Sequence, residues 1–434
     1  MNQKPEIAIV GLGYVGVTLA VTLADRGFPV WGYDHNQEVV KKLRQGKSHL
    51  FEPGVEELLQ LHLGVRLSVH DHLPDHFSGI LILCVSTPVS SSKAADLSHL
   101  QAATEAAAEC MTDGALVILR STVPIGTCRE LVLPILRSRH REVRLAFCPE
   151  RTIQGRALEE LRELPQVVGA LDEPSAQYAM ELWKQVTPQV IRVSSLEAAE
   201  MVKLANNCHT DVLYSFGNEI ALMACRLGLD PMEIIQASNA GYPRPQLARP
   251  GFVAGPCMSK DPYLLISTLK ETGYDPQLLL AARRLNERLP EEVGRHFIEN
   301  LRKCTGELQD AKVLICGFAY KGWPVTDDVR GTPVNSILSI LRQHPLRLYG
   351  HDYLVSPETI KTYGASPILE IDSGFDGARG VLFVNEHPEY SKLQMAELAK
   401  RMQRPALVYD CWRMLDKQFA QTIQGITYAG IGYG

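Results

Sequence analysis

The chain begins with a short buried-strand pattern, a glycine-rich turn and a helical pattern. The strand pattern runs from Glu6 to Val10, Gly11-Leu12-Gly13-Tyr14-Val15-Gly16 forms the turn, and the helical pattern extends through Ala24. In such units the first glycine permits a tight turn, the second lets a ligand approach the backbone, and the third lets the helix pack closely on the strand. This order constrains the fold strongly, because it commits the first residues to a parallel sheet covered by helices.

A carboxylate follows the second predicted strand. That strand runs from Val30 to Tyr33 and ends in Asp34, with no arginine immediately after it. A carboxylate there can accept hydrogen bonds from a ribose diol and repels a 2′-phosphate, so the pattern favours NAD over NADP. The cofactor pyrophosphate is then expected at the helix N-terminus, in contact with Gly11, Gly13, Tyr14, Val15 and Gly16. The alternative is a glycine turn of another α/β protein, and Asp34 counts against it.

Further apolar runs extend the predicted sheet, at Ile80–Val85, Leu116–Leu119 and Leu145–Cys148. Helical patterns separate them, which indicates a mostly parallel, doubly wound sheet. Polar loops follow the first two runs, at the carboxyl ends of strands where ligands of open sheets bind. Each loop alone is more often an ordinary turn. Their residues are nevertheless predicted cofactor contacts: Ser86, Thr87, Pro88, Ser121 and Thr122.

The pattern becomes helical in the middle of the chain. A long helix is expected over Leu196–Leu227 and a second over Asp275–Leu301, with an irregular Pro- and Gly-rich loop at Tyr242–Gly255. Strand patterns resume at Lys312–Gly317, Leu346–Tyr349, Gly380–Val384 and Ala406–Tyr409. We therefore predict an α/β protein with two Rossmann-like doubly wound domains, residues 1–195 and 303–434. A helical middle domain with a long central helix, residues 196–302, joins them.

The bulk composition excludes several classes of protein. A net charge of -5 argues against a nucleic-acid-binding surface, and no apolar run approaches the ~20 residues that span a bilayer. The start of the chain shows no signal-peptide pattern. The 10 cysteines include no Cys-x-x-Cys pair, which is typical of reduced, cytoplasmic proteins and excludes the common zinc and iron–sulfur spacings. His70, His72 and His76 suggest no fourth ligand, so we expect a solvated turn and no metal.

One cysteine has a suggestive environment. Cys257 lies in Gly255-Pro256-Cys257-Met258-Ser259-Lys260-Asp261-Pro262, close to a lysine and an aspartate, where a reactive thiolate is plausible. A simple alcohol dehydrogenase needs no covalent nucleophile. An enzyme that carries an alcohol through an aldehyde to an acid does need one, because thiol addition makes the aldehyde a hydride donor again.

Other polar residues lie in apolar contexts. Glu150 follows Cys148-Pro149 at a strand end, and Lys203 and Asn207 share one face of the long helix. Charges on the helix surface are the default interpretation of any one of them.

Together these segments resemble the nucleotide-sugar 6-dehydrogenases, the family of UDP-glucose and UDP-N-acetylmannosamine dehydrogenases. The resemblance covers nearly the whole chain. Besides the glycine turn it rests on Ser121-Thr122-Val123-Pro124, Pro149-Glu150, Lys203 with Asn207, Asn218-Glu219, Gly255-Pro256-Cys257 with Asp261, Gly317-Phe318-Ala319-Tyr320-Lys321 and Asp327-Asp328-Val329-Arg330.

The resemblance implies a four-electron oxidation of a UDP-sugar with two NAD in turn. The C6 hydroxyl becomes an aldehyde, Cys257 forms a thiohemiacetal and then a thioester, and water releases the uronic acid. Lys203 and Asn207 would hold the oxyanion, and Asp261 would assist deprotonation of the alcohol. Glu150, with a water on Thr122, would be the base of thioester hydrolysis.

The resemblance also implies the binding residues and the assembly. Lys260 and Arg330 are expected to contact NAD, with Arg330 also suited to a diphosphate. The substrate contacts are expected to be Glu150, Arg151, Lys203, Asn207, Arg244, Gly255, Tyr320 and Lys321. Arg244 loosely matches an arginine that the family lends across a dimer interface. We therefore expect a homodimer through the central helix, and a UDP-binding C-terminal sheet.

The chain departs from the UDP-glucose pattern in several places. Gln154 stands where that branch has a second glutamate, and Gly-Pro-Cys replaces Gly-Ser-Cys. The loop with Gly322-Trp323-Pro324 is long. These features favour UDP-N-acetylmannosamine or UDP-N-acetylglucosamine over UDP-glucose. His209 and Thr210 stand where the N-acetylhexosamine branch has an arginine close by, which counts against a direct transfer of that branch's substrate contacts.

Two other interpretations compete with this one. A two-electron dehydrogenase of the 6-phosphogluconate or 3-hydroxyacid type would share the glycine turn and the lysine–asparagine pair. It would give no role to Cys257 or to a second α/β domain. A non-catalytic nucleotide-sugar-binding subunit would not need the complete set of catalytic residues.

Overall fold

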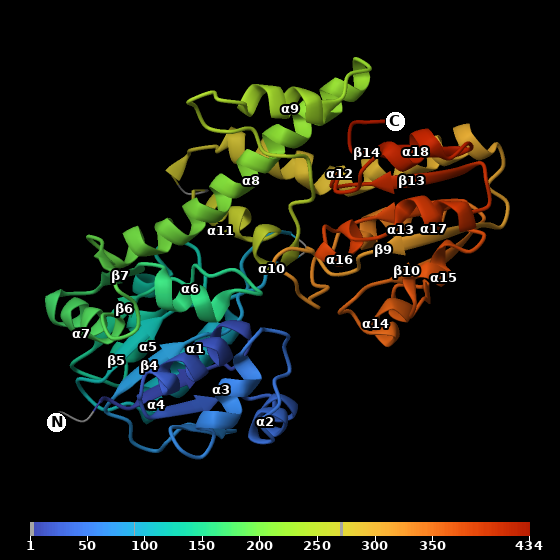
Figure 1. The fold of residues 1–434 in the computed structure, drawn as a ribbon. Coiled ribbons are helices and arrows are strands. Elements are labelled where there is room, and N and C mark those ends of the chain that lie inside the picture. The colour runs from blue at the N-terminus through green and yellow to red at the C-terminus, as the bar shows by residue number, and fades with distance from the viewer. Residues whose placement is uncertain (1–3, 91, 270–271) are drawn as a thin grey trace. The chain divides into compact units, whose positions relative to one another are not determined.

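The computed structural model describes residues 4–90, 92–269 and 272–434. The chain divides into two compact units (Figure 1). The N-terminal unit comprises Met1–Asn207 and Lys260–Asp275, and the C-terminal unit comprises Cys208–Ser259 and Pro276–Gly434. The chain passes from one unit to the other directly after Ser259, two residues beyond Cys257. This division differs from the three-part division expected from the sequence, whose boundaries stay a prediction.

The N-terminal unit contains an eight-stranded sheet in the order β3-β2-β1-β4-β5-β6-β7-β8. Neighbouring strands are parallel except β6 and β7, which are antiparallel. The predicted strands at Glu6–Val10, Val30–Tyr33, Ile80–Val85, Leu116–Leu119 and Leu145–Cys148 are confirmed, with ends that differ by no more than two residues. The strands are β1 (Ile7–Val10), β2 (Val30–Tyr33), β3 (Leu67–His70), β4 (Ile80–Leu83), β5 (Leu116–Leu119), β6 (Arg144–Phe147), β7 (Gln166–Ala170) and β8 (Val190–Arg192).

Helices cover both faces of this sheet because successive strand residues point to opposite sides. Ile7 and Ile9 pack in one core cluster, with residues of α1, α3, α6 and α7. Ala8 and Val10 pack in the other, with residues of α4, α5 and the start of α8. The helices are α1 (Tyr14–Asp25), α2 (Gln37–Arg44), α3 (Val55–His62), α4 (Ser98–Cys110), the π-helical turn η1 (Cys128–Val132), α5 (Leu133–Arg137), α6 (Ala157–Glu163), α7 (Glu173–Trp183) and α11 (Asp261–Thr268).

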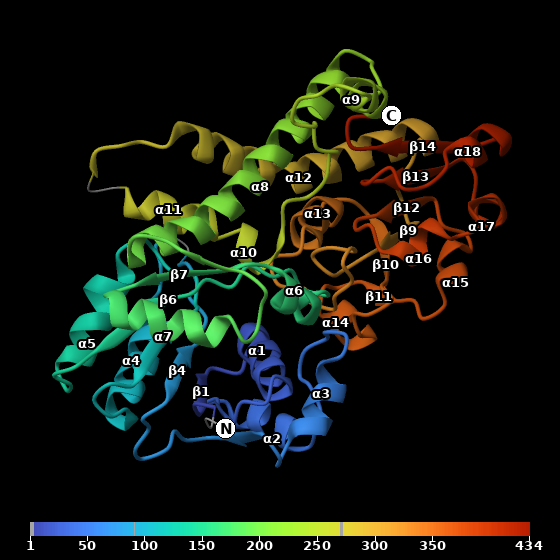
Figure 2. The same cartoon turned by 60° about the vertical axis from the view of Figure 1, so that its left-hand side comes forward.

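The C-terminal unit contains a six-stranded parallel sheet in the order β11-β10-β9-β12-β13-β14. Val313 and Ile315 face a core formed with α12 and α13, while Leu314 and Cys316 face a core formed with α15, α17 and α18. Figure 1 and Figure 2 both show helices on the two faces. The strands are β9 (Ala311–Cys316), β10 (Leu346–His351), β11 (Ser366–Pro367), β12 (Gly380–Phe383), β13 (Ala406–Asp410) and β14 (Ile426–Gly430). The helices among them are α13 (Val334–Leu341), α14 (Pro357–Thr362), α15 (Ile371–Phe375), α16 (Pro388–Ser391), α17 (Met395–Arg401) and α18 (Gln418–Thr422). The predicted fold class, with two Rossmann-like sheets, is confirmed.

The two sheets use the same device at their centre. In each, a glycine with positive φ follows the first strand, Gly11 at +93° and Gly317 at +96°. An aspartate after the neighbouring strand then accepts the next backbone N–H. Asp34 accepts from Leu12 at 2.8 Å, and Asp352 accepts from Phe318 at 2.6 Å. Since ligands of open sheets bind where the strand order reverses, both units present a turn of the kind that binds nucleotides.

The predicted helical middle is also confirmed. The long helix α8 spans Leu196–Arg226, and α12 spans Gln277–Thr305. Between them lie α9 (Pro231–Asn239), the irregular segment predicted from Tyr242 onward, and the short helix α10 (Gly255–Met258) that carries Cys257. Among the described residues, no helix combines the length and the apolar character that a membrane crossing needs.

Candidate active site

The glycine turn before α1 has the shape of a phosphate cradle. A Cβ on Gly16 would lie 1.8 Å from the carbonyl oxygen of Gly11, so only glycine allows this close packing of helix on strand. A Cβ on Gly13 would meet nothing within 4 Å, which leaves the face of the turn open. Gly13 is the N-cap of α1 and supplies no side chain to the helix. The N–H groups of the first turn, at Tyr14 and Val15, are therefore suited to bind an anion.

Asp34 is held where a ribose would need it. It is 8% exposed. Its Oδ2 accepts from the N–H of Leu12 and its Oδ1 from the N–H of Asn36, both at 2.8 Å. A carboxylate oxygen has about two acceptor sites, so both oxygens keep capacity for a diol. The cradle and this carboxylate together fit NAD.

The loops after β4 and β5 are bonded to each other. The Ser121 hydroxyl donates to the Val85 carbonyl at 2.6 Å, and the Thr87 hydroxyl donates to the Thr122 carbonyl. Lys260 lies at the same place, since its Nζ is 3.5 Å from the Thr87 hydroxyl. Other polar groups of these loops bond locally: Ser86 with His99 at 2.9 Å, and the Pro88 carbonyl with the Asp96 N–H at 2.8 Å. The structure thus gathers the predicted cofactor residues of the N-terminal unit.

A buried polar group connects α8 with α11. Asp261 is 0% exposed, and its carboxylate accepts from Lys260 Nζ at 2.8 Å and from the amide of Asn207. Lys203 lies one turn before Asn207 on α8 and is 9% exposed. In the parts of the chain that the structure describes, no hydrogen bond or ion pair engages the Lys203 ammonium. Its charge acts on Glu150 without a direct ion pair, and a buried cation of this kind is suited to stabilise an anion that forms during a reaction.

Glu150 has every acceptor position of its carboxylate filled. Oε2 accepts twice from the fully buried Arg120, at 3.1 and 2.7 Å. Oε1 accepts from its neighbours in the chain, the N–H groups of Arg151 at 2.7 Å and Thr152 at 2.8 Å. Burial opposes ionisation of the carboxyl, but Arg120, these N–H groups and Lys203 outweigh burial and lower the pKa of Glu150. Glu150 is therefore a fixed anion.

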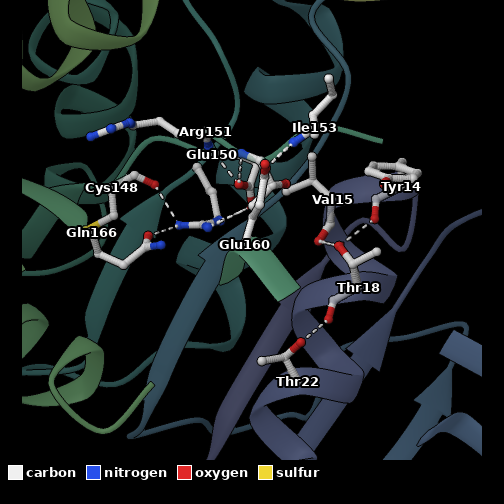
Figure 3. A network of polar contacts seen from close by, with 12 residues as sticks. Tyr14, Val15, Thr18, Thr22, Cys148, Glu150, Arg151, Ile153, Glu160 and Gln166 are labelled. Atoms are coloured by element: carbon white, nitrogen blue, oxygen red, sulfur yellow. Dashed lines mark hydrogen bonds and ion pairs between the residues drawn. The ribbon is translucent and has the colours of Figure 1, made fainter. Parts of the chain in front are cut away.

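Arg120 is the residue that the sequence prediction missed here. Its guanidinium also donates to the Cys148 carbonyl and to the Gln166 side chain, both at 3.1 Å, and it lies 4.6 Å from the Trp183 ring centroid. Figure 3 labels Glu150 and these two acceptors, Cys148 and Gln166. An arginine directly after the buried run Leu116–Leu119 is a signal that could have indicated it. Such an arginine is buried only with good partners.

A second carboxylate joins the glycine turn to the loop after Glu150. Glu52 is 7% exposed and accepts from the Tyr14 hydroxyl. It also accepts from the N–H groups of Gly155 at 2.6 Å and Ala157 at 2.7 Å, at the start of α6. No sequence motif indicated Glu52, because its partners lie far from it in the chain.

The C-terminal unit gathers a second set of predicted residues around Cys257, whose side chain is exposed. Gly255 has φ +94°, and a Cβ there would lie 2.5 Å from the Tyr320 ring, so the start of α10 packs directly on that ring. Its N–H donates to the Gly331 carbonyl at 3.2 Å. Lys321 Nζ lies 5.6 Å from the Tyr320 ring centroid.

Arg330 contributes a positive charge to the same set. It pairs with Asp328 at 2.6 Å. The hydrogen bond to Asp328 is the main cause that raises the pKa of Arg330. Gly331, the next residue, accepts from the N–H of Gly255, so the backbone after Arg330 lies at the start of α10. Arg244 is not part of this group, since it lies over Tyr242 and donates to the Pro243 carbonyl at 3.0 Å.

The histidines near β3 do not gather as metal ligands. His70 stacks on Trp31 with ring centroids 3.5 Å apart, and His72 lies edge-on to the same ring. Within residues 4–90, 92–269 and 272–434, no group of three or more His, Cys, Asp or Glu side chains could hold a metal ion.

Comparison with protein families finds three domains of one family along the chain. Residues 5–187 match the NAD binding domain of the UDP-glucose/GDP-mannose dehydrogenase family, 197–288 its central domain, and 314–417 its UDP binding domain. The chain belongs to the UDP-glucose/GDP-mannose dehydrogenase family. This protein is therefore an NAD-dependent oxidoreductase with a UDP-binding domain, and the predicted family, enzyme class, cofactor and UDP-sugar substrate are confirmed.

The family relatives extend over the whole chain. A UDP-N-acetyl-D-mannosamine dehydrogenase of Pyrococcus horikoshii is 34% identical over 99% of this chain and 99% of its own. The solved structure of a UDP-D-ManNAc dehydrogenase from that organism is 31% identical, with a TM-score of 0.87 over 98% of this chain and 99% of that one. A UDP-glucose dehydrogenase structure from Pyrobaculum islandicum is 28% identical, with a TM-score of 0.84 over 100% and 98%. Both kinds of sugar dehydrogenase thus share this fold.

Proposed function

We propose that this protein oxidises the C6 hydroxyl of a UDP-sugar to the uronic acid, in a four-electron reaction that uses two NAD. The favoured substrates are UDP-N-acetylmannosamine and UDP-N-acetylglucosamine, and UDP-glucose is the alternative. The observation that carries the proposal is the buried Lys203 ammonium beside the Asn207–Asp261 pair, in the same unit as the NAD cradle. When bound at the glycine turn and Asp34, NAD would supply the hydride acceptor for each oxidation.

The first oxidation needs a proton acceptor and a group that holds the developing oxyanion. We assign the oxyanion to Lys203 and Asn207, which present a cation and an amide donor on one helix face. Asp261 is an anion held in place by Lys260 and Asn207. Through a water or with Lys203, it takes the proton of the C6 hydroxyl as the alcohol becomes the aldehyde.

The second oxidation needs the thiolate of Cys257. Its sulfur adds to the aldehyde carbon, and the resulting thiohemiacetal becomes a thioester when it loses a hydride and its hydroxyl proton. Water then attacks the thioester carbon, the carbon–sulfur bond breaks, and the products are the carboxylate and the free thiol. Arg330 is proposed to support this step, because its backbone neighbour Gly331 is bonded to the start of α10 and a cation near this helix favours the thiolate.

The remaining predicted residues have supporting roles in this proposal. With a lowered pKa, Glu150 is a weak base. We propose that Glu150 orients the water that attacks the thioester, on the side of Thr122. To reach the carboxylate, this water displaces one of the N–H groups that donate to Glu150. Arg151, Arg244, Gly255, Tyr320 and Lys321 are proposed contacts of the UDP-sugar.

Stoichiometry tests the function directly. We expect two NADH and one carboxylate per sugar, measured by absorbance and mass spectrometry against a panel of UDP- and GDP-sugars. Cys257→Ala should bind NAD with unchanged affinity and form no uronic acid. One NADH with a stable carbonyl product, or full acid production by Cys257→Ala, would refute the covalent mechanism.

We also propose a homodimer through α8. On the C-terminal unit's part of this helix an apolar stripe runs at three- and four-residue spacing, formed by the exposed Leu213, Phe216 and Met223 and the half-buried Ile220, and the exposed Leu227 continues it directly after the helix. This spacing puts the side chains on one face, and an exposed apolar stripe favours contact with another chain. The 10 cysteines, with no Cys-x-x-Cys pair in the sequence, support a reducing, cytoplasmic location.

A further inference from the structure

A fully buried ion pair lies next to the helix of Cys257 in the C-terminal unit. Asp211 on α8 is 0% exposed, Arg283 on α12 is 2% exposed, and Arg283 Nη1 donates to Asp211 Oδ1 at 2.6 Å. Asn286, one turn further along α12, donates to the same oxygen at 2.8 Å and to the Asp211 carbonyl at 3.0 Å. Burying two charges is costly unless their geometry is well satisfied, so this pair calls for a function beyond packing.

The ion pair is bonded to the backbone that carries the nucleophile. Arg283 Nη1 also donates to the carbonyl of Met258 at 3.1 Å, and Met258 directly follows Cys257 and ends α10. A helix of four residues has little stability of its own. The direction of α10 is therefore set by the groups that hold its ends.

The start of the same segment is held by an asparagine of α8. Asn218 accepts from the N–H of Gly251 at 2.8 Å and donates to the Gly251 carbonyl at 2.9 Å. Its amide also donates to Asn286 at 3.0 Å, which connects this clamp to the ion pair. Residues 251–258 are thus fixed at both ends by one continuous buried network.

We propose that Arg283 is a positioning residue for Cys257: through its bonds to Asp211 and to the Met258 carbonyl it fixes α10 in the orientation from which the sulfur attacks the aldehyde. Asn218 and Asn286 complete the network. Neither arginine nor aspartate touches the substrate in this role. The inference rests on the proposed function, and it concerns the second oxidation alone.

The position of the Cys257 sulfur therefore decides how the aldehyde divides between capture by the thiol and release from the enzyme. A well-placed sulfur captures the aldehyde before it leaves, whereas a displaced sulfur lets part of it escape. A displacement of ~1 Å can lower a reaction rate by about 10²-fold. The first oxidation depends on groups of the N-terminal unit and should be affected much less.

Arg283→Lys tests this in the full-length enzyme. Lysine keeps the charge opposite Asp211, but its ammonium ends one bond short of the position of Arg283 Nη1, the nitrogen that donates to both Asp211 and the Met258 carbonyl. With hydroxylamine present to trap free aldehyde, we expect the ratio of trapped aldehyde to uronic acid to rise about tenfold or more. We expect the alkylation rate of Cys257 by iodoacetamide, followed by peptide mass spectrometry, to change as well, with the NAD affinity unchanged.

Arg284→Lys is the matched control, because Arg284 is an exposed arginine next to Arg283 on the same helix. It should leave the partition as in the wild type. A loss of folded protein alone would lower both oxidations equally and leave the partition unchanged. If Arg283→Lys gives the wild-type partition and alkylation rate, the proposal is overturned.

Asn218→Ser provides a second route if Arg283→Lys fails to fold. It shortens the clamp on Gly251 and leaves the ion pair intact, and it should also raise the share of trapped aldehyde. An unchanged share in folded Asn218→Ser would then overturn the proposal. A wild-type enzyme that yields one NADH and a stable aldehyde would instead refute the proposed function, whatever the variants do.

Discussion

At the scale of single residues, the ionisation of Glu150 depends on Arg120. The carboxyl is buried and would favour its neutral form without a partner. Arg120, the N–H of Thr152 and the charge of Lys203 outweigh this burial and lower its pKa below the ordinary value of 4.5. A group whose pKa is lower in the folded state contributes stability above its unfolded pKa, and this contribution is lost as the pH falls through the folded pKa.

Glu150→Gln makes this dependence measurable. At pH 7 we expect it to cost about 3 kcal/mol of unfolding free energy, because Arg120 is left as a buried charge without a counterion. The difference from the wild type should persist down to pH 4.5 and shrink below it, as the wild-type carboxyl takes up its proton. Urea unfolding of both proteins between pH 7 and pH 3.5 measures it. A difference that stays constant over this range would contradict the assignment of the lowered pKa.

Residues that we propose as ligand contacts are indicated by local sequence patterns, whereas the residues that support them are not. Gly13, Asp34 and Glu150 stand next to strand ends, and Lys203 and Asn207 share a helix face, so local patterns indicate them. Arg120 lies 30 residues from Glu150, and Arg283 lies 72 from Asp211. No local pattern connects such partners, because only the tertiary fold brings them together.

At the scale of elements, two glycines of the turn between β1 and α1 have different roles, one in cofactor binding and one in folding. Gly13 faces open space, whereas a Cβ on Gly16 would collide with the Gly11 carbonyl at 1.8 Å. Gly13→Ala should therefore fold with an unchanged melting temperature and lose about tenfold or more in NAD affinity, since its Cβ occupies the face that a pyrophosphate approaches.

Gly16→Ala is the contrasting variant in the same turn. It should unfold at a clearly lower temperature or fail to accumulate, because strand and helix must separate to admit the methyl group. Thermal melts and calorimetric titration with NAD compare the two variants. Equal effects of both substitutions on the melting temperature would show that Gly13 and Gly16 do not have these separate roles.

The predicted strands were those with long apolar runs, and the strands not predicted have weaker patterns. Val190–Arg192 (β8) is an exposed edge strand whose last two residues face solvent, and Ser366–Pro367 (β11) has only two residues. Such edge strands form because a neighbouring strand offers unpaired backbone groups. Their own sequence does not specify them, so periodicity could not indicate them.

At the scale of the whole molecule, the resemblance of the two sheets could be predicted only in outline. The two sheets share a strand order, and in each an aspartate far along the chain lies at the glycine turn. Both features arise from the way in which the strands are connected. Between Gly11 and Asp34 the chain has 22 intervening residues, and between Gly317 and Asp352 it has 34. This unequal spacing hides the repeat from a search for sequence periods.

The apolar stripe of α8 is the basis for the proposed homodimer. Phe216 is 50% exposed and Met223 is 47% exposed in the single chain, which leaves them in water unless another chain covers them. Phe216→Glu puts a charge in the middle of the stripe, and two such charges would face each other in a symmetric dimer. We expect this variant to be a monomer by light scattering coupled to gel filtration, where the wild type has twice the mass of one chain.

Leu369→Glu is the matched control, because Leu369 is 74% exposed and belongs to the C-terminal sheet domain, away from α8 in the sequence. It should leave the dimer intact. If Arg244 reaches the substrate of the partner subunit, the Phe216→Glu monomer should also lose affinity for the UDP-sugar while it keeps its affinity for NAD. A monomeric wild type, or a Phe216→Glu variant that remains a dimer, would remove the stripe from the interface, and full activity of the monomer would remove Arg244 from the partner's site.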